Sequence, residues 1–464
     1  MTRETRPFSL RDKIGYLLGD FGNDFTFILS TMVLMKFYTD VVGISAGAVG
    51  TIMMIARFVD AFTDVTMGRI CDHSRVIPGR GKFRPWILRM CVPVSVASFL
   101  MYISGVARWP YPAKVGYLLA TYILWGSVFY TAVNIPYGSM ASAITDDPLG
   151  RQSLSTYRSM GAALAGTLIG VLVPVIAYEK IDGAETMIGW RVTLAAGIFS
   201  LLAVLAYLAC YALTRERILS DSGDASRRRQ TIRVMLREAV GNRALISIVA
   251  ASVVMLLAQL TMQNMGGYIF PDYYNQADAQ SVSTVLMMFG MLLSAALAKP
   301  LAARFGKAEV AAAANLFAGL VSLLTYALRP ASVWVFVGLQ MLGWLGLGLF
   351  SMVSWALITD VIDDSEAKKG VREDGSIYAM YSFARKLGQA AAAGVTGWLL
   401  TFIGYAPGAA GGQTQGVLDG IFAIATLVPA LGFVLLSAVL WLWYPLHKKR
   451  VEENAAMLKE KHAR

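Results

Sequence analysis

Charge is scarce in this sequence. Asp, Glu, Lys and Arg together make up 15% of its 464 residues, whereas a soluble globular chain carries about 25%. Hydrophobic residues account for 56%, and apolar runs recur from Lys13 to Trp443 with only short breaks. A soluble chain of this length would instead show several cores separated by polar linkers. The composition therefore excludes a water-soluble fold and indicates a protein whose solvent is the lipid bilayer.

Cysteine and histidine are also rare, with three residues of each. Cys71, Cys91 and Cys210 lie at wide spacing in or beside apolar runs, which favours buried small residues over a disulfide framework or a metal site. The histidines all lie outside the apolar runs. A histidine relay or a zinc centre inside the membrane is therefore excluded, and any proton carrier there must be a carboxylate. We expect no catalytic residue and no cofactor.

Twelve apolar runs have roughly the 20 residues that a helix needs to cross about 30 Å of hydrocarbon. They form two groups of six: 13–40, 46–71, 84–106, 116–143, 154–178 and 188–214, then 244–270, 282–303, 309–328, 332–362, 376–405 and 417–445. We predict an all-α membrane protein with twelve transmembrane helices in two six-helix bundles. The bundles are 1–215 and 244–445, with a polar linker at 216–243 and a charged tail at 446–464.

Lysine and arginine are unevenly divided between alternate loops, and cytoplasmic loops of membrane proteins hold an excess of them. The basic set contains Arg75, Arg80, Lys82, Arg84, Arg151, the segment from Arg215 to Arg243, Arg304, Lys307, Lys368, Lys369 and Arg372, whereas the other set has little beyond Arg108, Lys114, Lys180 and Arg329. We therefore expect both termini on the cytoplasmic side of a bacterial inner membrane. The same bias accounts for the net charge of +11, so the expected partner is the lipid bilayer and not a nucleic acid.

Two carboxylates on the second predicted helix form a candidate cation site. An ionised group at the bilayer centre costs at least about 2.5 kcal/mol on insertion scales, so charges there usually serve transport. Asp60 and Asp64 stand one helical turn apart and share a face with Arg57. The two carboxylates repel each other unless a cation or a proton lies between them, or Arg57 neutralises one. The spacing predicts a site for H⁺ or Na⁺, and a purely structural pair is the alternative.

Polar side chains on other predicted helices extend this candidate site. Thr131, Asn134 and Tyr137 recur at near-helical spacing on the fourth predicted helix, around Pro136, and neutral oxygens suit Na⁺.

Further charges occur on the first, fifth and eleventh predicted helices. They include Asp24, which shares a face with Asp20, then Arg158, and Lys386, which follows Arg385 and has Ser382 one turn before it. Their alternative role is to bridge loops or to extend towards the interface.

Three acidic residues, Asp360, Asp363 and Asp364, end the tenth predicted helix. Because they lie near the predicted cytoplasmic face, we interpret them as a structural latch to loop arginines and not as substrate contacts.

Seven segments, in this order along nearly the whole chain, resemble the glycoside-pentoside-hexuronide:cation symporter family of the major facilitator superfamily, which includes melibiose and glucuronide permeases. The segments are GDFGNDF, FYTDVVGISAGAVGTI, ARFVDAFTDVTMGRICD, GKFRPWIL, YTAVNIPYGS, VREDGSIYAMYSFARKLGQA and WYPL. The resemblance implies the major facilitator fold and transport by alternating access.

Residue roles follow from the resemblance position by position. It implies a cation site at Asp60, Asp64 and Thr131, and it implies sugar contacts at Asp24, Arg158 and Lys386. Asn134 stands where the melibiose-type pattern has a carboxylate that serves both sugar and cation, and Gly138 and Ser351 stand where it has two tryptophans. A simple melibiose specificity is therefore not expected. Tyr137 or Trp355 is the candidate aromatic surface for sugar stacking, although Trp355 has lipid contact as its alternative, and Ser382 completes the candidate substrate residues.

We accordingly predict a monomeric secondary transporter that couples uptake of a small sugar, a glycoside or hexuronide, to H⁺ or Na⁺. The alternative is a carrier or exporter of another organic anion such as a sulfonated sugar, because Arg158, Arg385 and Lys386 suit a carboxylate or sulfonate. A nontransporting sugar sensor would rest on the same residues. An intramembrane enzyme would need a catalytic histidine or acidic motif beside a sizeable aqueous domain, and the sequence has no such domain.

Overall fold

The computed structural model describes residues 6–218, 241–369, 374–408 and 412–462. The chain divides into two compact units, Met1–Arg227 with Leu400–Gln413, and Arg228–Leu399 with Thr414–Arg464. Most of the predicted linker lies outside the described residues, and the predicted domain boundaries stay a prediction.

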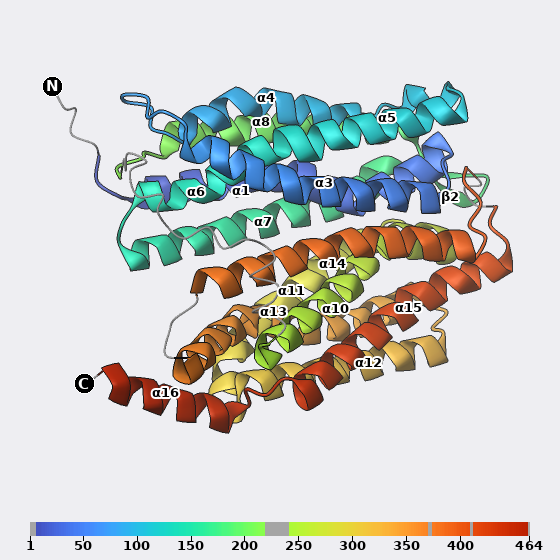
Figure 1. The fold of residues 1–464 in the computed structure, drawn as a ribbon. Coiled ribbons are helices and arrows are strands. Elements are labelled where there is room, and N and C mark those ends of the chain that lie inside the picture. The colour runs from blue at the N-terminus through green and yellow to red at the C-terminus, as the bar shows by residue number, and fades with distance from the viewer. Residues whose placement is uncertain (1–5, 219–240, 370–373, 409–411, 463–464) are drawn as a thin grey trace. The chain divides into compact units, whose positions relative to one another are not determined.

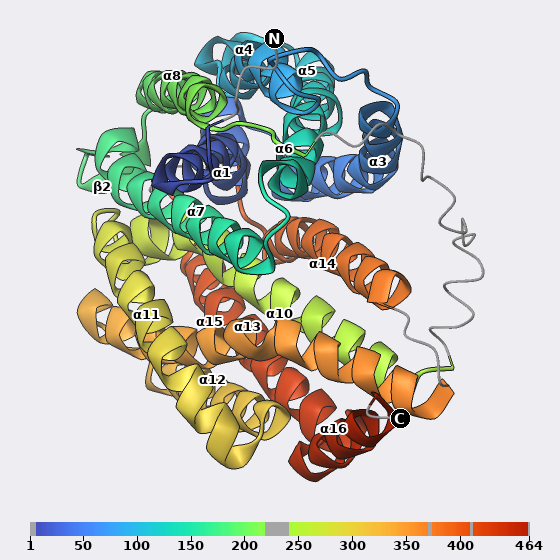
Figure 2. The same ribbon diagram turned by 90° about the vertical axis from the view of Figure 1, so that its left-hand side faces the viewer.

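The first unit is helical apart from one hairpin (Figures 1 and 2). Its elements are α1 (Leu10–Met32), α2 (Leu34–Lys36), η1 (Phe37–Val42), α3 (Ala46–Asp72), α4 (Arg84–Leu100), η2 (Ser104–Arg108), α5 (Tyr111–Ile123), η3 (Leu124–Tyr130), α6 (Thr131–Ile144), α7 (Pro148–Ala177), β1 (Tyr178–Ile181), β2 (Ala184–Met187) and α8 (Gly189–Leu213). Within this unit α1 packs against both α7 and α8.

The second unit is also helical. Its elements are α10 (Arg243–Tyr268), η4 (Ile269–Tyr273), α11 (Ala279–Phe305), α12 (Lys307–Leu328), α13 (Val333–Lys369), α14 (Asp374–Phe402), α15 (Gln415–Ala438), η5 (Val439–Trp443) and α16 (Lys448–His462). The last residues of α14, from Leu400 onward, belong to the first unit. Within the second unit α13 packs against both α11 and α12, and α15 packs against α10 and α12.

Apolar length supports most of the predicted spans. Ten of the described helices are long and apolar enough to cross a membrane, or up to eleven if the pair Leu10–Met32 and Leu34–Val42, bent by 47°, is one span. α14 has 29 residues and is not among these, although it occupies the place of the eleventh predicted helix. The all-α membrane fold is confirmed, whereas apolarity alone supports at most eleven of the twelve spans in the described part of the chain.

Two predictions about local structure are corrected. The tenth predicted helix, 332–362, continues as α13 to Lys369, because its acidic residues are neutralised: Lys307 Nζ lies 2.5 Å from Asp360 Oδ1, and Lys368 Nζ lies 2.6 Å from Asp364 Oδ2. The predicted latch to loop arginines is therefore formed mainly by lysines. Arg450 lies farther away, 3.9 Å from Asp364.

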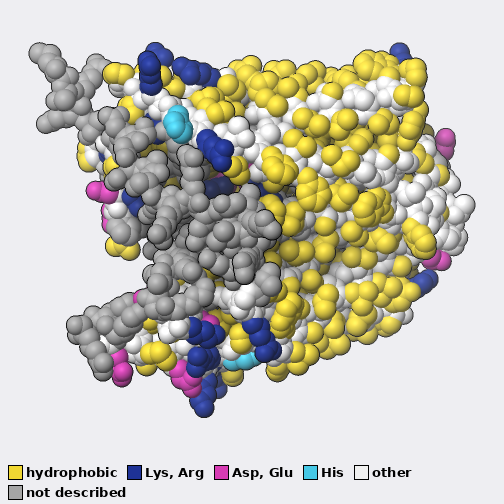
Figure 3. All heavy atoms as spheres, in the orientation of Figure 1, with side chains coloured by type: hydrophobic (Ala, Val, Ile, Leu, Met, Phe, Trp, Pro, Cys, Tyr) yellow, Lys and Arg dark blue, Asp and Glu magenta, His cyan; other side chains and the backbone are white. Residues whose placement is uncertain are grey.

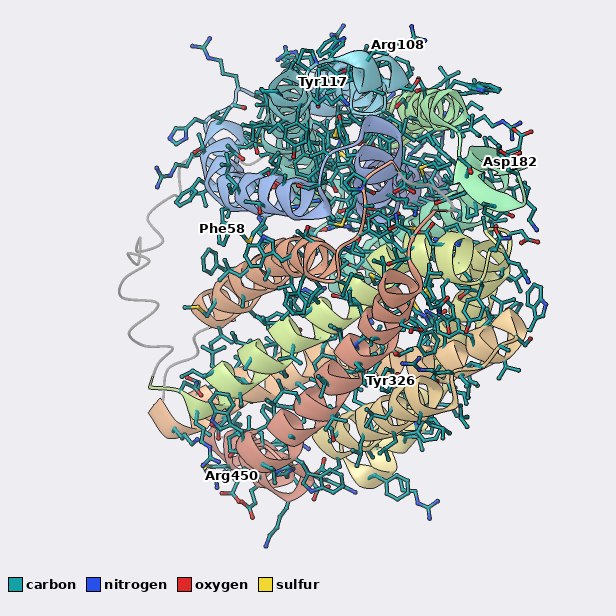
Figure 4. All side chains as sticks on the ribbon, turned by 90° about the vertical axis from the view of Figure 1, so that its right-hand side faces the viewer. Phe58, Arg108, Tyr117, Asp182, Tyr326 and Arg450 are labelled. Carbon is teal, nitrogen blue, oxygen red and sulfur yellow. The ribbon has the colours of Figure 1, made fainter. Side chains whose placement is uncertain are left out.

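The hairpin β1–β2 was not expected. Asp182 and Gly183 form its turn with φ of 51° and 83° (Figure 4), and an Asp-Gly pair is a strong signal for such a turn.

A carboxylate binds backbone N–H groups at the start of α4, which follows the segment Gly79-Arg80-Gly81-Lys82. Glu216 accepts hydrogen bonds from the backbone N–H groups of Lys82, Phe83 and Arg84, at 2.6, 2.9 and 2.7 Å. Arg84 is the first residue of α4, and its N–H has no partner within the helix and attracts negative charge. One buried carboxylate thus satisfies this donor and the two loop donors just before it. Gly81 makes this approach possible, because it has φ of 84° and a Cβ there would lie 2.6 Å from Glu216 Oε2.

Buried ionic groups also fasten the segment Leu400–Gln413 within the first unit. Lys36 Nζ lies 2.8 Å from both Asp40 Oδ2 and Tyr405 Oη, and the Tyr405 hydroxyl donates to Asp40 Oδ1 at 2.8 Å. The side chains of Lys36 and Asp40 are only 1% and 4% exposed. A buried cation tolerates this only when its donors are satisfied, and the triangle of contacts provides that.

We predict that Glu216→Ala destabilises the protein by at least about 1.5–3 kcal/mol, because it leaves three donors of a buried helix end without their charged acceptor. Glu179→Ala is the control, since Glu179 makes an exposed pair with Arg191 that contributes about 0–1 kcal/mol. Thermal unfolding in detergent measures both variants. Equal melting temperatures for Glu216→Ala and the wild type would show that water replaces the carboxylate.

Candidate cation and substrate sites

Two helices of the first unit place their polar residues in matching register. Asp60 and Asp64 are one turn apart on α3, and Ser127 and Thr131 are one turn apart on η3 and α6. Ser127 Oγ donates to Asp60 Oδ1 at 2.5 Å, and Thr131 Oγ1 donates to Asp64 Oδ1 at 2.8 Å. Each carboxylate thus meets one hydroxyl, and both hydroxyl side chains are buried. Four oxygen-bearing groups gather where the sequence predicted a cation site.

The π-helical segment η3 (Leu124–Tyr130) lies at this contact. Such segments are rare and frequently occur at functional sites, because the wider turn shifts side chains around the helix. Here the segment carries Ser127, and Gly126 brings the backbone close enough that a Cβ would lie 3.4 Å from Asp60 Oδ1. The irregular turn therefore sets which groups meet the α3 carboxylates.

Arg57 supplies a fixed positive charge beside the carboxylates. Its Nη1 lies 3.4 Å from Asp60 Oδ2, and both side chains are nearly buried, at 12% and 13% exposed. The guanidinium carbon lies 4.7 Å from the ring centre of Phe27, with Tyr122 and Trp125 within 6 Å. Aromatic faces attract cations, so these rings stabilise Arg57 where water is scarce.

A second group of charges lies between α1 and α7. Arg158 Nε is 3.1 Å from Asp20 Oδ1, and the arginine side chain stays 43% exposed whereas that of Asp20 is 9% exposed. Asp24, one turn further along α1, interacts electrostatically with both of them. No hydrogen bond or ion pair joins Asp24 to another described residue. The pair leaves guanidinium N–H groups and the Asp24 carboxylate for a hydroxyl-rich or anionic ligand.

The remaining predicted residues of the first unit differ in accessibility. Asn134 is half-buried on α6. Tyr137 is fully buried, its ring stacks on Tyr16 with centroids 4.6 Å apart, and its hydroxyl donates to the Tyr16 carbonyl oxygen at 2.6 Å. The Arg158 guanidinium carbon lies 5.5 Å from the Tyr137 ring centre. The ring of Tyr137 thus packs against the Arg158 guanidinium, and the Tyr137 hydroxyl is already hydrogen-bonded to Tyr16.

The predicted substrate residues of the second unit lie on α13 and α14. Trp355 is 43% exposed and packs edge-on against Tyr381, with ring centroids 5.1 Å apart. Arg385 lies over the same aromatic pair, 5.8 Å from the Trp355 ring centre. Ser382 and Lys386 stand one turn apart on α14 and are both half-buried. Within this unit, Trp355 therefore belongs to an aromatic and cationic cluster with α14.

Ser127 is the site residue that sequence reasoning missed. It lies four residues before Thr131, which is the spacing that separates Asp60 from Asp64. The repeated four-residue interval was the available signal. It could not be used from the sequence, because whether two helices pair in register depends on the tertiary structure. Tyr122 and Trp125 were missed because aromatic residues are common in apolar helices and have no spacing that marks a cation cage.

The family model for MFS/sugar transport protein matches residues 15–448. The chain belongs to this family. A glucuronide carrier protein homolog of Escherichia coli strain K12 is 31% identical over 97% of this chain and 95% of its own length. An isoprimeverose transporter of Lactiplantibacillus pentosus is 31% identical over 97% and 92%. A Salmonella typhimurium protein named, provisionally, as a 2,3-dihydroxypropane-1-sulfonate exporter is 32% identical over 96% and 94%.

Solved structures support the fold independently. A bacterial homologue of the iron transporter ferroportin, in an inward-facing state, superposes with a TM-score of 0.63 over 93% of this chain and 100% of its own, at 13% identity. The nucleoside transporter NupG gives a TM-score of 0.59 over 97% and 100%, at 12% identity. These similarities show the fold alone. The family and its relatives identify this chain as a multi-pass membrane transporter and not an enzyme.

We predict that Tyr137→Phe lowers stability by about 0.5–1.5 kcal/mol through loss of one buried hydrogen bond. The ring that supports Arg158 is retained, so the apparent KM for transport is expected to stay within twofold of the wild type. Unfolding in detergent and uptake kinetics in vesicles measure the two effects. A large rise in KM with unchanged stability would instead place the hydroxyl on the substrate.

Proposed function

We propose that this transporter carries a glycoside or hexuronide together with one H⁺ or Na⁺ by alternating access. The observation that supports it best is the register of Asp60 and Asp64 with Ser127 and Thr131, because carboxylate and hydroxyl oxygens are hard ligands for small cations. Asp20, Asp24 and Arg158 supply acceptors and donors that suit sugar hydroxyls. Relatives named for glucuronide and isoprimeverose point to the same class of cargo.

The charge balance of the cation site supports a stoichiometry of one. Two carboxylates and the Arg57 guanidinium sum to −2 + 1 = −1, so one monovalent cation or one proton neutralises the group. A single charge moving down 100 mV releases about 2.3 kcal/mol. Since about 1.4 kcal/mol corresponds to a tenfold gradient, that energy supports accumulation of roughly fortyfold or more. Coupling follows if the cation and the sugar each bind the same conformation better than the other, which makes the effect reciprocal.

We further propose that the protein acts as a monomer in a bacterial inner membrane with both termini in the cytoplasm. The excess of lysine and arginine in alternate loops supports the proposed orientation of the termini.

A second candidate function is transport of an organic anion such as a sulfonated sugar, inward or outward. The half-exposed Arg158 guanidinium favours it, because that group forms paired hydrogen bonds with carboxylates and sulfonates. The relative named for a sulfonate points the same way. A nontransporting sensor is less favoured, since the relatives described above are named as a carrier, an exporter and a transporter.

We predict that Asp60→Asn and Asp64→Asn each abolish accumulation of substrate against its gradient, while exchange of substrate across the membrane continues. Removal of either negative charge leaves no net charge for a coupling cation to neutralise. Uptake of labelled glycosides and hexuronides by vesicles under imposed sodium or pH gradients measures this. Asp182→Asn at the exposed hairpin turn is the matched control, because asparagine also accepts a positive φ. Full concentrative uptake by both site variants would contradict the cation assignment.

We also predict that Arg158→Ala weakens substrate binding by about 10- to 100-fold, the loss expected for a hydrogen bond to a charged group. Arg151→Ala on the same helix is the control, since the Arg151 side chain donates to the Thr145 carbonyl oxygen near the start of α7. Calorimetric titration with neutral glycosides, hexuronides and sulfonated sugars separates the two candidate functions. A loss confined to anionic ligands favours the organic anion carrier, and unchanged affinity for every ligand removes Arg158 from the site.

A further inference from the structure

An apolar groove opens on the second unit, formed by α11, α12, α13 and η5. Its volume is about 590 Å³, within the range of about 300–1,000 Å³ typical of small-molecule sites. Leu345, Gly346 and Leu349 of α13 line it between the two flanking helices. Figure 2 shows α11 and α12 on either side of α13. Gly346 lets α12 and α13 touch, because a Cβ there would overlap the backbone oxygen of Ala314.

Four of the side chains that line the groove are well exposed. Leu297, Phe305, Phe317 and Trp441 are 39%, 53%, 50% and 54% exposed. The hydroxyl of Ser294 is already engaged, since it donates to the backbone oxygens of Gly290 and Leu345. An apolar surface of this kind on a membrane transporter faces the lipid hydrocarbon. It offers few hydrogen-bond partners to a sugar, whereas it suits an acyl chain.

Two cations lie next to one end of the groove, beyond the residues that line it. The Arg304 guanidinium lies 5.1 Å from the ring centre of Phe305, and no carboxylate among the described residues pairs with it. Lys448 Nζ donates to the Arg304 carbonyl oxygen at 2.9 Å, with Glu452 at 3.9 Å. In Figure 3, Lys and Arg side chains gather at the end of the second unit where α16 lies, and hydrophobic side chains cover its flank over α12 and α15. Arg450 extends from the same helix (Figure 4).

Other charged groups at this end have partners, although Glu309 Oε2 is buried without a hydrogen-bond partner among the described residues. Lys307 binds Asp360. Glu309, which lines the groove, accepts a hydrogen bond from the Lys448 backbone N–H at 2.8 Å and lies 3.4 Å from His447 Nδ1. The Arg304 guanidinium has no carboxylate partner among the described residues. Lys448, beside Glu452, keeps ammonium donors beyond its bond to the Arg304 carbonyl oxygen, so both cations can meet an anion beside the apolar groove.

We propose that this groove is a phospholipid site, in which one acyl chain lies against α13 and the lipid phosphate is bound by Arg304 and Lys448. An apolar cavity that ends at two cations matches the two parts of such a lipid, a hydrocarbon chain below a phosphate. The site is separate from the transport residues and does not depend on which solute is carried.

Photolabelling with a phosphatidylglycerol that carries a diazirine in its acyl chain tests the proposal on the full-length protein in vesicles. We expect adducts in the wild type to concentrate on the groove segments 294–317 and 345–349. Ala313→Trp fills the groove and should lower this labelling at least fivefold. Leu320→Trp is the matched control on α12, because Leu320 is 55% exposed and lies outside the groove. Adducts spread evenly over all lipid-exposed helices would overturn the proposal, whatever the variants do.

The headgroup contact has its own test. Arg304→Ala combined with Lys448→Ala should lower labelling by the phosphatidylglycerol probe severalfold while leaving a diacylglycerol probe with the same diazirine unchanged. Arg329→Ala is the control, since Arg329 pairs with Asp419 after the far end of α12. Equal labelling of the double variant and the wild type by both probes would show that the phosphate is not bound there.

Discussion

The bilayer core holds almost no water, and every ionised side chain in it needs a partner within the protein. The structure satisfies this demand in several small clusters of the first unit. Asp60 meets Arg57 and Ser127, Asp20 meets Arg158, and Lys36 with Asp40 and Tyr405 forms a closed triangle. Each cluster neutralises charged side chains within an otherwise apolar fold. Its contacts also fix the relative positions of the segments that carry those side chains. Two of these clusters are only partly neutralised, and they are the ones that we propose as the cation and substrate sites.

The two partly neutralised clusters have different character. Around Asp60 and Asp64 the carboxylates exceed the fixed positive charge by one, and the nearby neutral donors are buried hydroxyls, which suits a small cation. Around Arg158 the guanidinium is half-exposed, and Asp24 lies close by without a partner among the described residues. α1 and α3 are successive long helices, and their aromatic neighbours connect the clusters: Phe27 on α1 contacts Arg57 on α3 and stacks with Tyr130.

Much of this architecture was readable in the sequence. Asp60 and Asp64 were predicted as a pair from their spacing alone, and the hydroxyl of Thr131 beside them followed from the family resemblance. The helix order came from apolar length. The π segment η3 was not predicted, because its composition is that of an ordinary apolar helix and its wider turn arises from packing. Ser127 was missed for the same reason. The continuation of α13 past Asp360 depends on Lys307 and Lys368, which neutralise charges that would otherwise end a membrane helix.

The sequence by itself determined the solvent of this protein and the positions of its helices, because hydrocarbon selects long apolar runs and excludes unpaired charge. It also determined that charged residues within those runs are the candidates for function. Only the tertiary structure decided which charges neutralise each other. Arg57 had Asp60 and Asp64 within reach on its own helix, and the structure pairs it with Asp60 while Thr131 contacts Asp64. The choice depends on the rotation of neighbouring helices and on the π segment, and spacing along one helix carries no information about either.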